Sequence, residues 1–332
     1  MTIVLDAMGS DGRPNPEVQA AVTASNQLNE DIALVGDEAV LLEKLNSIPG
    51  DQSRVHIIHA PEALDMSDHI AEARSKKQNT MRVGMDLVKA GEGDAFVTAG
   101  NTGMAMYYAK KVFGDIPGVI RPCLCAVFPV RNGQAVVLDI GANAECRPEF
   151  LVQFAIMGNI YAQTMLDITN PRIGLLANGE EEGKGNNLVR NTYPMLKNTN
   201  LNFIGNVEGK ELFGGQVDVA VTDGFTGNIM LKSTEAVAKL IVDILKEELM
   251  SSLRTKIGAL LAKPAFGKIR EMLDPSEIGA APLLGIDSLV FVGHGRSDAR
   301  AVVSSIHAAK QAVDNQLLGE LRKSIIENIQ KD

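Results

Sequence analysis

Lys184 is the residue whose type and setting point most directly to chemistry. It stands between Gly183 and Gly185, in a polar turn that follows the apolar residues 173–176. An ammonium group on such a turn can stabilise the oxyanion that forms when a nucleophile attacks a carbonyl carbon. Three glutamates at 180–182 also allow a second interpretation, in which Lys184 is an ordinary solvated lysine.

Other turns place amide, hydroxyl and guanidinium groups directly after short apolar runs. Asn101, Thr102 and Gly103 follow one such run, and His294 lies between two glycines after another. Turns of this kind lead into helices whose N-termini expose N–H groups that bind anions such as phosphate. The candidate phosphate and substrate ligands are Asp6, Gly9, Arg13, Asn101, Thr102, Gly103, Asn143, Asn178, Asp223, Thr226 and Asn228.

Several of these residues also have a structural interpretation. Asn101 and Thr102 can cap the helix that is expected to begin near Met104, and Thr226 and Asn228 carry the same ambiguity. A side chain can cap a helix and contact a ligand at once, so both interpretations stay open.

The titratable groups at these turns have different expected roles. Asp139 and Asp223 end their predicted strands and are expected to orient neighbouring groups, because phosphate is already ionised at neutral pH and needs no base. His294 can donate to an anion or assist a leaving thiol, and it can equally be a buried structural histidine. The chain has no Gly-x-Ser-x-Gly elbow, so no protein nucleophile is expected. Lys184 and His294 are the two candidate catalytic residues.

The elements that must position these residues repeat one pattern. A short β-branched run leads into a turn rich in Gly, Asn, Asp and Thr and then into a helical stretch. Continuous apolar strands separated by helices predict a three-layer α/β/α fold with a mainly parallel sheet. No linker divides the chain, so residues 1–332 are expected to form one catalytic domain, with either one lobe or two lobes that share the sheet.

Composition and charge exclude several classes of protein. Aromatic residues make up 4% of the chain and Trp is absent, which argues against a protein that stacks on bases or sugars. The net charge of −9 predicts no nucleic-acid partner. The N-terminal residues lack the features of a signal peptide, and no apolar run reaches the ~20 residues of a membrane span, so a cytoplasmic location is expected.

Neither a metal nor a cofactor is expected. Cys123 and Cys125 share one face of a predicted strand, but no His or Cys lies at zinc-finger spacing, so core packing is the favoured interpretation. The Gly-rich turns at 183–185 and 293–295 do not continue to the third glycine of a dinucleotide fingerprint.

A basic amphipathic segment spans residues 251–270. It contains no acidic residue and five basic ones, which are Arg254, Lys256, Lys263, Lys268 and Arg270. Residues 262–267 are expected to form the tip of a helical hairpin over 236–275. Such a hairpin on an acidic protein predicts contact with an anionic membrane surface, and a dimer-packing arm is the alternative or additional role. The apolar residues expected at the membrane are Leu253, Ile257, Leu260, Leu261 and Phe266.

Taken in order, the turns resemble those of the bacterial phosphate acyltransferases that make acyl-phosphate from acyl carrier protein for phospholipid synthesis. The resemblance runs almost end to end, and its most specific motif is Asp-Gly-Phe-Thr-Gly-Asn at 223–228. The other matching motifs are at 6–9, 99–103, 138–143, 205–208, 283–285 and 294–295. The sequence departs from the family where Gly12 replaces a usual histidine, beside an Arg13 that can supply another donor, and where 278–281 reads Ile-Gly-Ala-Ala.

The resemblance implies a fold like that of phosphotransacetylases and the isocitrate dehydrogenase group. It also implies a functional lysine at position 184, inorganic phosphate and acyl carrier protein as substrates, a homodimer, peripheral membrane binding, and a downstream membrane acyltransferase as a further partner. Carrier protein is strongly acidic, so a basic cluster becomes a candidate docking site, with a solvated helix face as the alternative. That cluster is Arg74, Lys76, Lys77 and Arg82.

Two other functions remain open at this point. A short-chain phosphotransacetylase would use an acyl-coenzyme A donor, and a catalytically silent scaffold would bind carrier protein at the membrane without turnover. A dehydrogenase is disfavoured because no cofactor fingerprint is present.

Overall fold

The computed structural model describes residues 1–131, 133–273 and 279–329. The strands are β1 (Thr2–Asp6), β2 (Asp31–Gly36), β3 (Val55–His59), β4 (Ala95–Thr98), β5 (Cys123–Val130), β6 (Gly133–Leu138), β7 (Ile173–Leu176), β8 (Phe203–Val207), β9 (Val219–Val221), β10 (Ala281–Leu284) and β11 (Val290–Val292). The helices are α1 (Asn15–Leu28), α2 (Glu38–Ser47), α3 (Ile70–Ser75), α4 (Thr80–Ala90), α5 (Thr102–Val112), α6 (Pro148–Leu166), α7 (Asn187–Lys197), α8 (Gly209–Phe213), α9 (Gly224–Met250), α10 (Leu253–Leu273), α12 (Ala299–Asp314) and α13 (Leu317–Ile329).

All eleven strands join one sheet, in the order β3-β2-β1-β4-β11-β10-β5-β6-β9-β7-β8. Neighbouring strands are parallel except at three consecutive pairs, β11–β10, β10–β5 and β5–β6. The predicted mainly parallel sheet is therefore confirmed. Because three reversals separate the two parallel blocks, the blocks run in opposite directions, and their carboxyl ends lie at opposite edges of the sheet.

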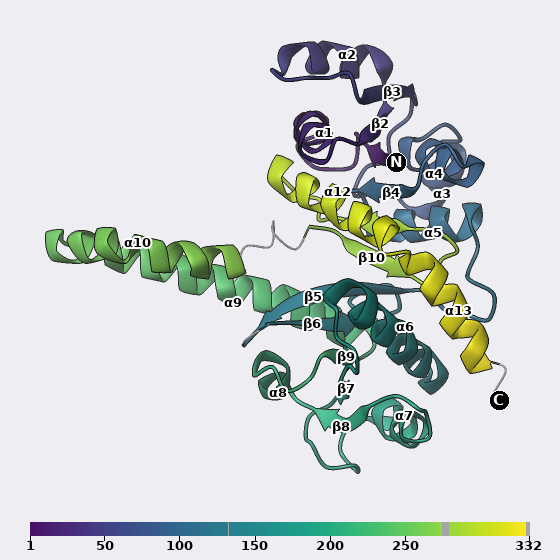
Figure 1. Ribbon diagram of the computed structural model, residues 1–332, viewed down its shortest axis with the longest axis vertical. Coiled ribbons are helices and arrows are strands. Elements are labelled where there is room, and N and C mark those ends of the chain that lie inside the picture. Colours follow the sequence, from purple (N-terminus) through teal and green to yellow (C-terminus); the bar gives the residue numbers. More distant parts are fainter. Residues whose placement is uncertain (132, 274–278, 330–332) are drawn as a thin grey trace.

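Helices cover both faces of this sheet (Figure 1). Alternate residues of β1 enter different cores, with Ile3 and Leu5 on one face and Val4 on the other, as the period of a strand requires. The first core is closed by α1, α2, α6, α7, α12 and α13, and the second by α4, α5 and α8. Cys123 and Cys125 pack in the first core, which confirms their assignment as core residues.

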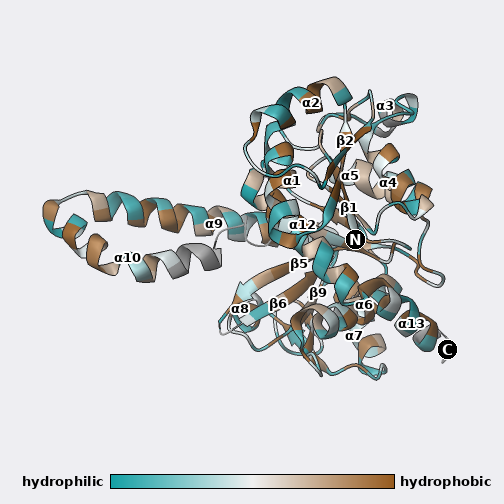
Figure 2. Ribbon diagram, turned by 45° about the horizontal axis from the view of Figure 1, so that its top comes forward, coloured by the Kyte–Doolittle hydropathy of each residue, from teal (hydrophilic) through white to brown (hydrophobic). Residues whose placement is uncertain are grey.

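Helices α9 and α10 form a hairpin that projects away from the body of the molecule (Figures 1 and 2). The chain turns at Ser251 and Ser252, and the prediction of a tip at 262–267 is wrong. The Ser252 hydroxyl accepts a hydrogen bond from the backbone N–H of Thr255 at 3.2 Å, which caps α10 at its first turn. Pro264, which suggested the turn, lies inside α10.

Part of the predicted hairpin cannot be described. Residue 275, its expected end, and Ile278 of the departing family motif lie outside the described residues. The side chains of Lys268 and Arg270 also lie outside them. Among the helices that the structure describes, none is both long and apolar enough to cross a bilayer.

Candidate active site

The reversal in the sheet divides the predicted site residues into two groups. The β1–β4 cluster follows β1, β4 and β11 and contains Asp6, Gly9, Arg13, Asn101, Thr102, Gly103 and His294. The β6–β7 cluster follows β6, β9 and β7 and contains Asn143, Asn178, Lys184, Asp223, Thr226 and Asn228. No hydrogen bond or ion pair joins the two clusters in the parts of the chain that the structure describes.

The turns of the β1–β4 cluster touch one another closely. A Cβ atom on Gly9 would lie 2.8 Å from the Gly100 nitrogen, so only glycine fits where these two turns meet. Beneath them, buried Asp6 accepts hydrogen bonds from the Met8 N–H at 3.0 Å and the Thr98 hydroxyl at 2.7 Å. Burial raises the pKa of the Asp6 carboxyl, and these hydrogen bonds oppose that shift. Asp6 therefore organises the turns from within the protein.

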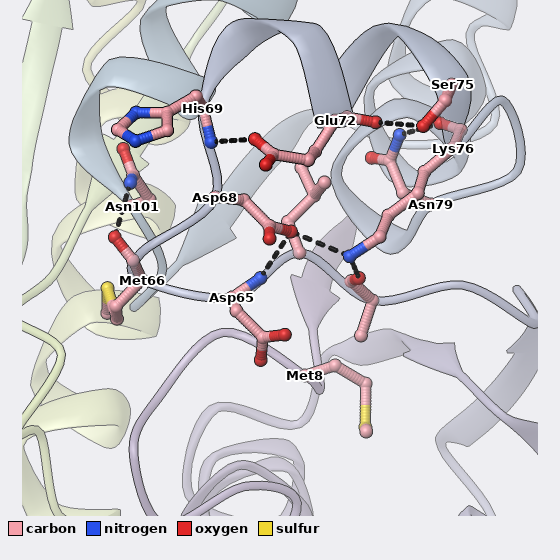
Figure 3. Close-up of polar contacts among 12 residues, drawn as sticks. Met8, Asp65, Met66, Asp68, His69, Glu72, Ser75, Lys76, Asn79 and Asn101 are labelled. Carbon is pink, nitrogen blue, oxygen red and sulfur yellow. Dashed lines mark hydrogen bonds and ion pairs between the residues drawn. The ribbon is translucent and has the colours of Figure 1, made fainter.

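Arg13 and Asn101 both hold the segment that follows β3. The Arg13 guanidinium donates to the carbonyls of Met8 and Leu64, each at 3.0 Å, and pairs with the Asp65 carboxylate. The Asn101 amide donates to the Met66 carbonyl at 2.8 Å (Figure 3). Its carbonyl oxygen accepts from the N–H of Met104 at 3.1 Å, as a helix cap does.

His294 is exposed, which excludes the interpretation of a buried structural histidine. Its Nδ1 accepts a hydrogen bond from the Arg296 N–H at 3.3 Å, so the proton of a neutral ring lies on Nε2. The Thr102 hydroxyl makes no hydrogen bond within the described ranges, and Gly103 is exposed beside it. Nε2 of His294 and the Thr102 hydroxyl are thus the uncommitted side-chain donors of the β1–β4 cluster.

The four basic residues of the predicted docking patch differ in whether their charged groups are paired with other residues. The half-buried Lys76 ammonium is paired, 2.7 Å from Asp68 and 2.9 Å from the Ala63 carbonyl (Figure 3). Arg82 pairs with Asp86 at 3.4 Å, one helical turn along α4. Arg74 and Lys77 are exposed.

In the β6–β7 cluster, the Asp139 carboxylate is a structural hub. One of its oxygens accepts from the N–H groups of Leu124, Gly141 and Ala142 at 3.0–3.1 Å. The other accepts from the backbone N–H of Asn143 at 2.6 Å and from its side-chain amide at 3.0 Å. Burial raises the pKa of Asp139, but five donors leave it no free lone pair for a base, as the sequence predicts.

The first turn of α9 packs directly on this hub. Asp223 caps the helix, accepting from the backbone N–H of Thr226 at 2.8 Å and from its hydroxyl at 2.9 Å. A Cβ on Gly227 would lie 1.9 Å from the Asp139 carbonyl oxygen, so no other residue fits there. Asn228 lies beside Gly141, and its amide makes no hydrogen bond to any residue the structure describes.

Lys184 lies on the turn between β7 and α7. Its backbone N–H donates to the Glu181 carbonyl at 2.9 Å, and the Gly185 N–H donates to the Asn178 side chain at 2.9 Å, which closes the turn. The stem of Lys184 lies over Gly179, where a Cβ would come within 2.8 Å of its Cγ. The ammonium itself is exposed and has no hydrogen bond or ion pair with a described residue.

Comparison with known proteins shows the family to which the chain belongs. The sequence matches the family described as "Fatty acid synthesis protein" over residues 1–319. It is 46% identical over 329 residues to the phosphate acyltransferase of Elusimicrobium minutum. The alignment covers 98% of this chain and 96% of that protein. It is 43% identical over 309 residues to that of Clostridioides difficile, covering 92% and 91%. This chain belongs to the phosphate acyltransferase family.

Solved structures of other enzymes share the fold of this acyltransferase. A phosphotransacetylase from Streptococcus pyogenes superposes with a TM-score of 0.61 at 18% identity, covering 94% of both chains. A branched-chain phosphotransacylase from Enterococcus faecalis gives 0.60 at 12% identity, covering 94% of this chain and 99% of that one. At such low identities these matches carry the fold alone, and they confirm the predicted phosphotransacetylase-like architecture.

The predicted docking patch includes contacts that sequence reasoning missed. Lys111 lies 5.6 Å from the Tyr107 ring centroid, and a hydrogen bond from Arg74 lowers the pKa of the Tyr107 hydroxyl. Helix α5 therefore adds a cation to the patch that carries Arg74. Only the packing of α3 on α5 brings these charges together, because they are far apart in the sequence.

Proposed function

We propose that this acyltransferase makes acyl-phosphate from fatty acyl-acyl carrier protein and inorganic phosphate, as a step toward phospholipids. The observation that carries the proposal is the free ammonium of Lys184, held on a closed turn in a chain of this family. A phosphate oxygen forms a bond to the thioester carbonyl carbon, and the carbon–sulfur bond breaks. The carrier leaves as a thiolate, which takes up a proton.

The β6–β7 cluster supports binding of phosphate and stabilisation of the oxyanion. Lys184, Asn178 and Asn228 have side-chain donors without a partner among the described residues, and in the first turn of α9 the backbone N–H of Phe225 is likewise uncommitted. Asp139, Asn143 and Asp223 hold these groups in place rather than meeting the substrate. We assign Lys184 to the developing negative charge, because an ammonium can follow the oxygen as the carbonyl carbon becomes tetrahedral.

The carrier protein is proposed to dock on the patch formed by Arg74, Lys77 and Lys111. These cations are exposed, whereas Lys76 is held by Asp68 and contributes mainly to the fold. A basic surface of this kind speeds the encounter with an acidic carrier.

The hairpin of α9 and α10 is proposed to bind the surface of an anionic membrane. Leu253 is 79% exposed and Leu261 80%, beside the exposed cations Arg254, Lys256 and Lys263. Figure 2 shows hydrophobic positions along the projecting hairpin. Ile257 and Leu260 are also exposed, while Phe266 is half-buried and contributes less. An acyl-phosphate released there would lie next to a downstream membrane acyltransferase.

A homodimer is proposed because the candidate catalytic residues of one chain lie in different clusters. His294 follows β11 and Lys184 follows β7, at opposite edges of the sheet. A second copy can place the β1–β4 cluster of one chain opposite the β6–β7 cluster of the other. Exposed apolar residues on α9, including Val237, Leu240 and Ile244, offer a surface for that contact.

The direct test mixes the purified protein with palmitoyl-acyl carrier protein, with and without phosphate, and measures free carrier thiol and acyl-phosphate. We expect release that depends on phosphate and falls by at least about a hundredfold in Lys184→Ala. The matched control is Lys310→Ala, since Lys310 is paired with Asp314 on α12. Equal or faster turnover of acetyl-coenzyme A would favour a short-chain phosphotransacetylase. Carrier binding without turnover would favour a scaffold.

A further inference from the structure

Three consecutive glutamates precede Lys184; the side chains of Glu180 and Glu182 and the backbone of Glu181 are each tied to a different element. Glu180 pairs with Lys210 of α8 at 2.7 Å, and Glu182 pairs with Lys197 at the end of α7 at 3.5 Å. The Glu181 carbonyl accepts from the buried Asn206 amide of β8 at 2.9 Å. The turn that carries Lys184 is therefore held from three sides.

Lys210 has an unusual setting for an exposed lysine. Besides Glu180, its ammonium lies 3.6 Å from Glu208 and 3.5 Å from Glu211, the residues that form the capping box of α8. One cation thus faces three carboxylates. The hydrogen bond to Glu180 and the charges of the three carboxylates raise the pKa of Lys210, and the same hydrogen bond lowers the pKa of Glu180, so both groups are charged throughout the neutral range.

The pairing matters because Glu180 is four residues from Lys184 on the same turn. A carboxylate freed at that position would have a high effective concentration at the Lys184 ammonium. It would compete there with phosphate, which also binds as an anion. In the structure neither Glu180 nor Glu182 forms an ion pair with Lys184, and each is paired with another lysine. The Glu181 carboxylate, which also lies over Gly179, forms no ion pair with a described residue.

We propose that Lys210 is a positioning residue that holds Glu180 on α8 and so keeps the Lys184 ammonium available to phosphate. This inference rests on the proposed function, in which Lys184 meets phosphate and the oxyanion. Lys197 acts on Glu182 in the same sense, over a longer distance. Lys210 does not itself touch the substrate.

The test compares Lys210→Met, Lys210→Arg, Glu180→Gln and the double variant Lys210→Met with Glu180→Gln. In Lys210→Met we expect the KM for phosphate to rise about two- to fivefold, the range of one exposed ion pair, with a smaller change in kcat. Lys210→Arg should behave as the wild type. The double variant should recover a normal KM, because the competing carboxylate is gone.

Recovery in the double variant distinguishes two roles of Lys210: neutralising the Glu180 carboxylate, or supporting the turn mechanically. If Lys210 only braced the turn, removing its partner as well could not restore the KM, and that result would overturn the proposal. An unchanged KM in Lys210→Met would overturn it too. Lys310→Met, which breaks an ion pair on α12, is the matched control.

A second readout does not depend on acyl transfer. Labelling of the Lys184 amine by sulfo-N-hydroxysuccinimide acetate, measured by peptide mass spectrometry, should slow in Lys210→Met and recover in the double variant. If the wild type makes no acyl-phosphate but labelling changes in this way, the proposed function fails and the positioning role stands. If acyl-phosphate forms but labelling is equal in all variants, the positioning role fails alone.

Discussion

Lys184 and Lys76 lie in similar polar surroundings along the chain but have opposite environments in the fold. Lys76 is bound to Asp68 and to the Ala63 carbonyl, and its charge is used to hold the segment after β3. Lys184 has three glutamates before it, yet two of those are paired elsewhere. At the scale of the residue, function depends on which charges remain unpaired after folding.

A prediction at this scale concerns Gly179, over which the stem of Lys184 lies. We expect Gly179→Ala to displace Lys184 and lower kcat on the order of tenfold, because the added Cβ would come within 2.8 Å of Lys184 Cγ. The matched control is Gly183→Ala on the same turn, where a Cβ would meet nothing within 4 Å. Steady-state kinetics measure kcat for both variants. An equal decrease in kcat would show that both alanines act through the flexibility of the turn instead.

Among the elements, the hairpin shows how a capping signal outweighs a proline. Ser252 and Thr255 exchange hydrogen bonds at the start of α10, which sets the turn at the far end of α9. Pro264 loses only one backbone hydrogen bond within a helix of 21 residues. Leu253 and Ile257 therefore lie next to the turn, farthest from the body of the molecule.

This geometry predicts which residues meet a membrane first. The double variant Leu253→Glu with Ile257→Glu should lose most of its binding to vesicles of phosphatidylglycerol, because both side chains are exposed near the tip. Val40→Glu with Leu42→Glu on α2 changes the charge equally at exposed apolar positions of the body. Co-sedimentation with vesicles measures the difference. Binding lost equally in both pairs would point to net charge rather than to the hairpin.

Helices α3 and α5 together predict the behaviour of the docking patch. Arg74→Glu with Lys77→Glu should raise the KM for acyl carrier protein about tenfold or more, with kcat little changed, since both cations are exposed. The charge-matched control is Lys44→Glu with Lys323→Glu, on α2 and α13. The effect should weaken as salt is added. A KM for the carrier that is unchanged would remove this patch from the docking site.

For the whole molecule, the decisive feature is the direction of the strands. Because of three antiparallel pairs in the middle of the sheet, the strands of the two parallel blocks run in opposite directions. His294 and Lys184 thereby belong to opposite edges, and neither cluster alone contains both candidate catalytic residues.

The proposed homodimer makes a prediction that a monomer cannot meet. Mixing Lys184→Ala and His294→Ala chains, after unfolding and refolding together, should restore roughly a quarter of the wild-type activity, because half the dimers are mixed and each has one intact site. Each variant refolded alone is the control. Activity that stays at the level of the single variants would mean that the two residues do not share a site across copies.

The sequence by itself determined the elements and the motifs. Continuous apolar runs such as those of β1 and β4, followed by turns of Gly, Asn and Asp, suffice to predict the strands, the caps and the parallel pairing. These signals are local, since they depend on a few neighbouring residues. The end-to-end resemblance added the family, which the relatives confirm.

Only the tertiary structure decided how those pieces face one another. The reversal at β5 and β10, the commitment of Arg13 to Asp65, and the pairing of Glu180 with Lys210 all join residues that are distant in the sequence. Local patterns carry no information about such partners, because the sequence around a charged residue is the same whether or not its side chain forms an ion pair in the fold. Whether a lysine is free for chemistry is therefore a property of the fold.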